Sequence, residues 1–440
     1  MSDLPRKAVA RTARLATLPL GFGARAALGF GKRVGGRPAE VVAAELQAQT
    51  AEHLFRVLGT LKGGAMKFGQ SLSMLESAVP EELAGPYRAT LTRLQEAAPA
   101  MPVATVHKIL AQELGDDWRD RFQSFDDKPA AAASIGQVHR AVWEDGQEVA
   151  VKVQYPGAGE ALMSDLNQLS VVARLTTSWV PGLEIGPILD ELKGRMAEEV
   201  DYDMESAMQE QFALSYADDP AYVLPEVVAS SQHVIISEWI EGIPLSKIIS
   251  EGTQEQRDIA AARYLEFLIG GPERAGLLHA DPHPGNFRLL PDGRLGVLDF
   301  GAVNRLPEGL PPELGRLVTL GLESRAEEVL DGLRDEGFIK STISIDPDEL
   351  LDYLSVFLTP LASDEFTFSR DWIRGIFNYI NDPRSAQFRV GLRLNLPPRY
   401  VLIHRTWLGG IAVLCQIGGT VPAREIFDRC VPGAELPPVG

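Results

Sequence analysis

The hydrophobic positions of this 440-residue chain change period several times, which predicts alternating helical and strand-rich stretches. Over residues 50–78, apolar residues recur at alternating steps of four and three, as on one continuous helix face. A shorter helix is expected near 102–114. Residues 122–155 then change to the alternation typical of strands, with a turn at Asp145-Gly146, and we expect three strands there.

Further along the chain, helical patterns cover 158–180 and 187–215, and a strand pattern returns over 233–245 before a Gly/Pro break. From residue 254 onward the pattern is mostly helical, interrupted by a loop and by the strand-like segment 294–303. The order of elements therefore predicts an α+β protein in which a small strand-rich lobe precedes a helical lobe.

One segment, Thr406–Ala423, carries no charge and is the longest candidate for a membrane span. It contains several glycines, Gln416 and Pro422, and it falls short of the roughly 20 predominantly apolar residues that a spanning helix needs. We therefore predict a buried core helix followed by a turn.

Composition places the chain among globular proteins, with 45% hydrophobic and 23% charged residues, and its length predicts two or three packed units. Two cysteines, no CxxC motif and no secretory segment favour a reducing, cytoplasmic setting. The net charge of −18 argues against nucleic-acid binding, which depends on neutralising phosphates with Lys and Arg.

Residues 1–37 form a basic arm that contrasts with the acidic remainder, because Asp3 is its only acidic residue. Apolar residues interrupt the basic ones, so the arm could lie on an anionic bilayer at the inner face of a membrane. A solvated tail is an equally good interpretation, and an organelle transit peptide is a less favoured one.

The segment "HADPHPGN" and the later "LDFG" carry the chemistry of phosphate transfer. Asp281 and Asn286 have the spacing of a kinase catalytic loop, in which the aspartate positions the acceptor and the asparagine holds magnesium. Asp299 would be the second magnesium ligand. A metal site made of His279, Asp281 and His283 is a weaker alternative, because no helical His pair or thiolate accompanies it.

An altered glycine loop precedes this segment at "AAASIGQV", followed by "VAVK". Lys152 would reach the nucleotide phosphates from a strand. Alanine restricts φ where glycine would not, so we expect a changed nucleotide preference rather than lost binding. The loop residues expected at the nucleotide are Ala131, Ala133, Ser134, Gly136 and Val138.

The helix glutamate that pairs with Lys152 is predicted to be Glu205. Asp201 and Glu205 are four residues apart and should share a helix face, where like charges repel unless a cation intervenes. A solvated acidic face is the alternative. The segment "SEWIEG" fits a hinge between lobes, and Glu238 and Ile240 are expected to meet the base there.

Taken together, these motifs resemble the UbiB/AarF family of atypical kinase-like proteins. The resemblance rests on "KFGQ", "AAASIGQVH", "VAVK", "EVDYDMES", "HADPHPGN" and "LDFG", in this order over most of residues 50–305. It implies a protein-kinase-like bilobal fold with an N-terminal helical extension across the active site. The expected segments are an arm (1–37), the extension (38–115), an N-lobe with a helical insert (116–240) and a helical C-lobe (241–440).

The resemblance also implies that Lys67 and Gln70 lie near Glu199 and Asp201 and gate the site. Family members bind ATP or ADP with Mg²⁺, look like ATPases or unorthodox kinases, and are linked to isoprenoid quinone synthesis or lipid homeostasis. Ala280 replaces the arginine of ordinary protein kinases and no A-P-E follows "LDFG", which supports an unorthodox activity.

The predicted function is therefore a Mg-dependent ATPase or atypical kinase, a phosphotransferase acting on or gated by a quinone-like or lipid-linked molecule. A nucleotide-gated lipid-binding scaffold or chaperone with vestigial catalysis is the alternative, favoured by the alanine-rich loop. A small-molecule phosphotransferase of the aminoglycoside-kinase type is less favoured, because "KFGQ" has no place in it.

Overall fold

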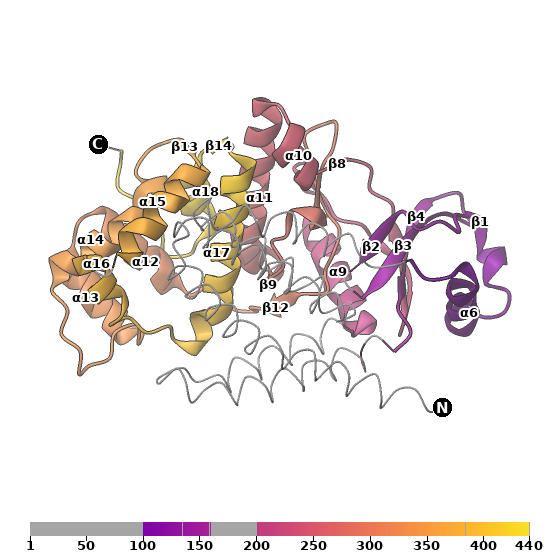
Figure 1. Cartoon of the computed structure of the whole chain (residues 1–440), viewed down its shortest axis with the longest axis horizontal. Coiled ribbons are helices and arrows are strands. Elements are labelled where there is room, and N and C mark those ends of the chain that lie inside the picture. Colours follow the sequence, from indigo (N-terminus) through magenta and orange to yellow (C-terminus); the bar gives the residue numbers. More distant parts are fainter. Residues whose placement is uncertain (1–99, 134, 158, 160–199, 383, 440) are drawn as a thin grey trace, which may run out of the picture. The chain divides into compact units, whose positions relative to one another are not determined.

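The computed structural model describes residues 100–133, 135–157, 159, 200–382 and 384–439, which divide into two compact units (Figure 1). Among these residues, the first unit comprises 100–206 and 227–239, and the second comprises 207–226 and 240–439. The predicted helix at 50–78, the motif "KFGQ" and the basic arm lie outside the described residues. Of the helical patterns predicted at 158–180 and 187–215, residues 158 and 160–199 also lie outside them.

The first unit is built on a six-stranded antiparallel sheet of order β1-β3-β4-β7-β6, with β2 paired to β3. Its elements are α6 (Val103–Leu114), the 3₁₀ helix η2 (Trp118–Arg121), β1 (Phe122–Phe125), β2 (Ala131–Ala133), β3 (Gly136–Trp143), β4 (Glu148–Gln154), β6 (Val227–Ser231) and β7 (Val234–Glu238). The helix predicted near 102–114 is confirmed. The expectation of three strands over 122–155 is wrong, because the short alanine strand β2 makes a fourth.

Strand β4 shows why this sheet forms. Its residues Val149, Val151 and Val153 alternate along the strand and are fully buried at 0% exposure, next to buried residues of β7 and α6. The residues between them, including Lys152, project from the opposite face. The apolar face of the sheet therefore forms the core, and the opposite face carries Lys152.

A chain of buried hydrogen bonds connects Met101, just before α6, to strand β3. The Met101 N–H donates to Gln137 Oε1 at 2.7 Å, and Gln137 Nε2 donates to His139 Nε2 at 2.8 Å. Because His139 Nε2 accepts from the amide, the proton is on Nδ1, which donates to the Asp126 carbonyl at 2.7 Å, and the imidazole is neutral. Burial lowers the pKa of His139, which keeps it neutral at physiological pH.

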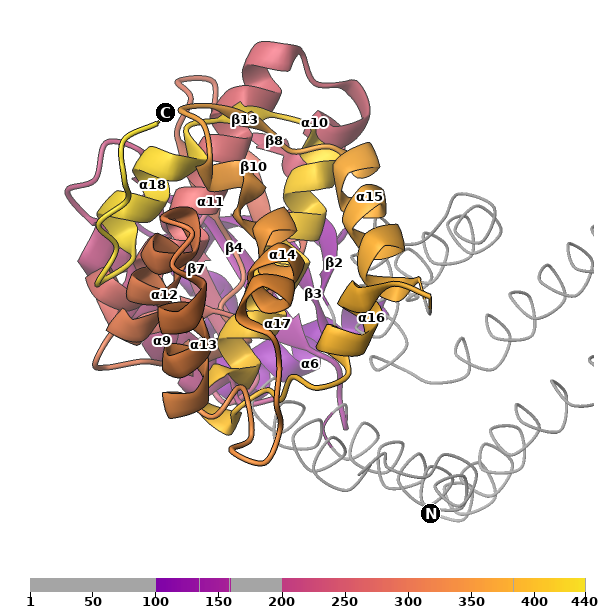
Figure 2. The ribbon, with the colours of Figure 1, turned by 90° about the vertical axis from the view of Figure 1, so that its left-hand side faces the viewer.

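The second unit is mostly helical and contains three small sheets (Figures 1 and 2). The sheets have the orders β5-β11-β10-β8, β12-β9 and β13-β14. The strands are β5 (Tyr222–Val223), β8 (Ile243–Pro244), β9 (Leu277–His279), β10 (Phe287–Leu289), β11 (Leu295–Val297), β12 (Val303–Arg305), β13 (Phe366–Thr367) and β14 (Thr420–Val421).

Its helices follow the pattern expected beyond residue 254, which is therefore confirmed. They are α9 (Tyr202–Tyr216, from residue 207 onward), α10 (Leu245–Glu251), α11 (Gln254–Ala275), α12 (Pro312–Leu322), α13 (Ala326–Asp335), α14 (Pro347–Leu358), α15 (Arg370–Asn381), α16 (Ala386–Gly391), α17 (Pro398–Ile417) and α18 (Ala423–Cys430), with the 3₁₀ helices η4 (Pro284–Asn286) and η5 (Thr359–Leu361).

Helix α11 is the centre of this unit, and local sequence fixes both of its ends. Thr253 accepts the Gln256 N–H while the Gln256 side chain accepts the Thr253 N–H, a capping box. Gly276 ends the helix in the left-handed conformation at φ 65°. Figure 1 shows α17 and α18 beside α11, in agreement with their packing.

Helix α17 corresponds to the segment predicted as a core helix and a turn. It begins at the Pro398 position and ends at left-handed Gly418, so it starts earlier than expected, and β14 follows. Within the described ranges it is the one helix long and apolar enough to cross a membrane, and 56% of its apolar window is buried inside the protein. The predicted buried helix followed by a turn is confirmed.

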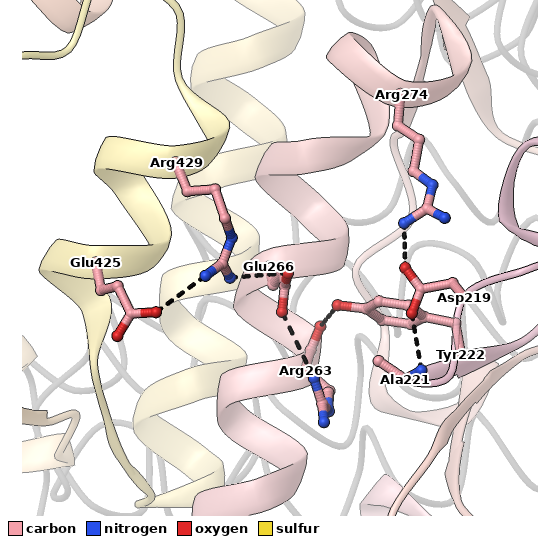
Figure 3. A network of polar contacts seen from close by, with 8 residues as sticks. All are labelled: Asp219, Ala221, Tyr222, Arg263, Glu266, Arg274, Glu425 and Arg429. Atoms are coloured by element: carbon pink, nitrogen blue, oxygen red, sulfur yellow. Dashed lines mark hydrogen bonds and ion pairs between the residues drawn. The ribbon is translucent and has the colours of Figure 1, made fainter.

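A polar network on the surface holds α11 to its neighbours (Figure 3). Arg429 of α18 donates to Glu266 of α11 at 2.8 Å and to Glu425 at 3.0 Å. On another side of α11, Arg274 pairs with Asp219, which precedes β5. These contacts lie near the surface and each stabilises the fold little. Together they hold α18 and the segment before β5 against α11.

Candidate active site

Lys152 and Glu205 form a buried ion pair in the first unit. Lys152 Nζ donates to Glu205 Oε1 at 2.5 Å, with side-chain exposures of 17% and 3%. The lysine projects from the face of β4 opposite the buried valines, and the glutamate lies in the first turns of α9. The ammonium also lies 5.2 Å from the centre of the Tyr202 ring, a cation–π distance. The structure thus brings together the two residues that the sequence paired.

Asp201 has a different role from the one expected of it. Helix α9 begins at Tyr202, and the exposed Asp201 side chain accepts the Met204 N–H at 2.9 Å. Asp201 therefore caps the helix instead of sharing a face with Glu205, and the expected repulsion is wrong. Glu199, its predicted partner in gating, lies outside the described residues, as do Lys67 and Gln70.

The altered glycine loop is a β2–β3 hairpin in which Ala131 pairs with Val138 and Ala133 pairs with Gly136. A Cβ at Gly136 would lie 2.4 Å from the Val153 carbonyl oxygen, so only glycine fits there without movement of β4. Ala131 is exposed at the rim of the sheet. Ser134 lies outside the described residues.

In the second unit, Asp281 and Asn286 belong to one tightly bonded loop. Asn286 Nδ2 donates to the Asp281 carbonyl at 3.3 Å, and the exposures of the two residues are 8% and 6%. The Tyr264 hydroxyl of α11 donates to the Pro282 carbonyl at 2.5 Å. Burial raises the pKa of Tyr264 far above its usual range, so the hydroxyl keeps its proton. The sequence analysis missed Tyr264.

His279 links the loop to Asp299. Its Nε2 donates to the Asp299 carbonyl at 2.6 Å, and four buried phenylalanine rings surround it. The Asp299 carboxylate in turn accepts the Gly301 N–H at 3.1 Å. His279 is thus a positioning residue in an aromatic core. This placement opposes the alternative of a metal site built on His279, and no cluster of three His, Cys, Asp or Glu side chains suited to a metal occurs in the described ranges.

The chemistry of Asn286 and Asp299 fits magnesium. The amide nitrogen of Asn286 is held by the Asp281 carbonyl, and the amide oxygen is the atom that would ligate a metal ion. Magnesium prefers oxygen ligands, and it is commonly bound by one or two protein groups together with substrate phosphates. An amide oxygen and a carboxylate match that requirement.

The predicted hinge divides into two differently placed residues. Glu238, at the end of β7, accepts Gln147 Nε2 at 2.7 Å within the first unit. Ile240 is buried at 7% exposure in the second unit, and the position of a Cβ on Gly296 would lie 3.0 Å from its Cγ2. The single strand expected over 233–245 is two strands, β7 and β8, in separate sheets, because residues 240–242 leave the first sheet.

Comparison with known families agrees with this arrangement. The family model described as "ABC1 atypical kinase-like domain" matches residues 93–330, more than half of the chain. This chain belongs to that family. The resemblance drawn from the motifs and the α+β, kinase-like fold class are thereby confirmed.

Named members of the ABC1 family show how far the similarity reaches. The mitochondrial atypical kinase coq-8 of Caenorhabditis elegans is 28% identical over 97% of this chain and 58% of that protein. The mitochondrial atypical kinase COQ8 of Saccharomyces cerevisiae is 27% identical over 97% of this chain and 85% of that protein. COQ8B of Danio rerio is 32% identical over 69% of this chain and 50% of that protein, so this chain spans only about half the length of some of its relatives.

Among solved structures, the Mycobacterium tuberculosis protein Rv3197, determined as a complex with erythromycin, is similar with a TM-score of 0.71. It is 41% identical in sequence, and the match covers 91% of this ABC1-family chain and 100% of that one. The similarity therefore extends well beyond the kinase-like segment.

Proposed function

We propose that this chain is an atypical kinase or ATPase that binds an adenine nucleotide with Mg²⁺ and serves isoprenoid quinone or lipid metabolism. The observation that carries the proposal is the Lys152–Glu205 pair, 2.5 Å long and almost entirely removed from solvent. A lysine–glutamate pair of this kind orients the phosphates in kinases, and a buried pair is a poor source of stability by itself.

The other residues have complementary roles in this proposal. Asn286 and Asp299 would hold magnesium, which supplies charge neutralisation between the phosphate oxygens. Asp281, held by the loop around it, would position the acceptor, which is either a hydroxyl or water. Ala131, Ala133, Ser134, Gly136 and Val138 would border the phosphates, with Glu238 and Ile240 at the base.

Gating and membrane contact belong to the same proposal. Lys67 and Gln70 would act with Glu199 and Asp201 to control access to the site. The basic arm, residues 1–37, would contact an anionic membrane from the cytoplasmic side, and the gated molecule would be a quinone-like or lipid-linked one. These features rest on the sequence and on family membership.

Phosphate release from ATP tests the proposal most directly. Asp299→Asn should abolish Mg-dependent release, because one of the two magnesium ligands loses its charge. Asp292→Asn is the matched control, since Asp292 is an exposed turn residue that pairs with Arg294 at 2.7 Å. The reaction is followed with and without anionic vesicles and quinone-like phenols. Equal turnover by wild type and Asp299→Asn would refute the assignment.

A second candidate function is a nucleotide-gated binding protein with vestigial catalysis. Its support is the 41% identical structure solved with erythromycin, together with the alanine-rich hairpin. In this case the chain would bind a large amphiphilic lactone of the macrolide class. Calorimetric titration of the whole chain with erythromycin, with and without Mg-ATP, tests it. Nucleotide binding without phosphate release, combined with macrolide binding, would favour this second function.

A further inference from the structure

One stretch of the second unit has the opposite charge to the rest of the chain. Residues 383–424 contain six arginines and neither aspartate nor glutamate, although the whole chain has 60 acidic residues and a net charge of −18. Two of these arginines are used inside the protein, since Arg399 pairs with Glu336 and Arg424 donates to the Leu361 carbonyl at 2.6 Å. The arginines of α16 and of the turn after it are exposed instead.

Helix α16 ends with an apolar side chain between two arginines. Leu392 and Arg393 follow Arg389 by three and four residues, and backbone hydrogen bonds continue the helical turn through both, so the three share one face. Leu392 is 72% exposed, while Val390 is buried at 1% and anchors the helix. Within the described ranges Arg389 forms no hydrogen bond or ion pair, and Arg393 donates to the Ser344 carbonyl at 3.2 Å. Both guanidinium groups therefore keep donors for a ligand.

Helix α14 extends the apolar part of this surface. Figures 1 and 2 both show α14 beside α16, in agreement with their packing. A Cβ on Gly391, the residue before Leu392, would lie 3.4 Å from the Tyr353 ring, and the centre of the Phe357 ring lies 5.8 Å from that of Tyr353. Phe357 is itself 41% exposed. One exposed leucine on a surface is ordinary, but here an exposed leucine and an exposed phenylalanine lie on either side of one ring.

An anionic lipid bilayer fits this combination of side chains. Its headgroups attract arginines, and leucine and phenylalanine enter the boundary between headgroups and acyl chains. A bilayer accepts a protruding side chain such as Leu392, whereas a protein partner would need a matching pocket. The acidic neighbour of this face, Asp352 of α14, accepts the Tyr379 hydroxyl at 2.8 Å and Gln387 Nε2 at 2.6 Å, so its carboxylate is bonded to these two residues and not to the arginines.

We propose that this surface of the second unit docks on an anionic lipid bilayer. The docking surface consists of Tyr353, Phe357, Arg389, Leu392 and Arg393. The proposal goes beyond the proposed function, in which the basic arm alone contacts the membrane, because it gives the second unit a contact of its own. One weak signal gives only marginal membrane binding, whereas two together give stable anchoring. The docking surface would be the second signal.

Binding of the full chain to lipid vesicles tests the proposal. Vesicles of phosphatidylcholine alone are compared with vesicles that also contain phosphatidylglycerol, and the bound fraction is measured by co-sedimentation. The double variant Arg389→Gln/Arg393→Gln should bind the anionic vesicles about 25-fold more weakly, because each arginine near an anionic surface contributes about fivefold. Leu392→Ser should weaken binding about fivefold, through the loss of an inserted apolar side chain.

Two matched variants make the same chemical changes elsewhere on the second unit. Leu214→Ser alters a leucine of α9 that is 81% exposed, and Arg294→Gln alters an exposed arginine that pairs with Asp292 at 2.7 Å. Both should bind vesicles as wild type does. Added salt should reduce the difference between wild type and the double arginine variant, because salt screens exposed charges. All changed side chains are exposed, so thermal unfolding should match wild type.

Wild-type binding by the double arginine variant would overturn the proposal, because the basic arm would then account for all of the binding. An equal loss on neutral vesicles, or displacement of the wild type by inorganic phosphate, would overturn it as well. A wild-type chain that ignores anionic vesicles would also overturn it and would favour an acidic protein as the partner. Phosphate release from ATP without vesicles should be equal in wild type and in the surface variants. A wild type that releases no phosphate would instead contradict the proposed function, so the two failures are distinguishable.

Discussion

Removing one partner of the Lys152–Glu205 pair should destabilise the first unit much more than removing both. Glu205→Gln leaves the ammonium, which is only 17% exposed, without its carboxylate. Breaking a fully buried pair costs about 3–5 kcal/mol. Here the residual exposure and the Tyr202 ring at 5.2 Å soften the loss, so we expect about 2–3 kcal/mol.

The double variant Lys152→Met/Glu205→Leu should recover most of that stability, to within about 1 kcal/mol of wild type, because neither charge then has to be desolvated. A double-mutant cycle would thus show strong coupling between the two positions. Glu148→Gln is the control, since the Arg140–Glu148 pair has a similar 2.8 Å distance but exposures of 39% and 50%, and its loss should cost less than about 1 kcal/mol.

Because the chain has two units, stability has to be read locally. Hydrogen–deuterium exchange of peptides covering β3 and β4, followed as urea increases, reports on the unit that contains the pair. A double variant as unstable as the sum of the two single variants would refute the reasoning, because the pair would then be a net source of stability. Full recovery of stability with complete loss of nucleotide binding would identify the pair as functional.

Three further predictions concern smaller features. Gly136→Ala should weaken nucleotide binding and lower the urea midpoint of the first unit, because its Cβ would lie 2.4 Å from the Val153 carbonyl oxygen; normal values for both would contradict the contact. Tyr264→Phe should cost about 1–2 kcal/mol by leaving the buried Pro282 carbonyl unbonded, and should slow phosphate release; unchanged stability and turnover would contradict it. The pKa of His139 is lowered in the folded state, so keeping this side chain neutral contributes to the free energy of unfolding. That contribution should be complete above about pH 6.5 and be lost as pH falls toward the folded pKa. His139→Gln should remove this pH dependence in urea titrations.

The sequence predicts the residues whose chemistry follows from a fixed spacing. Lys152 lies between two buried valines, and the order of the kinase motifs predicted a partner glutamate on the following helix. The pair forms as predicted, although the helix face that Glu205 was expected to share with Asp201 is wrong. The buried character of α17 was likewise predictable from its uncharged, glycine-rich half, whereas its start at Pro398 was not predicted.

Where prediction failed, a second interaction had overridden the local pattern. The β2 strand has three alanines with low strand propensity, and it forms because it pairs with β3. Asp201 was placed on a helix face because spacing alone does not reveal where a helix begins, and a cap and a first-turn residue look alike in sequence. Tyr264 was missed because a buried aromatic residue in a helix gives no indication of what its hydroxyl contacts.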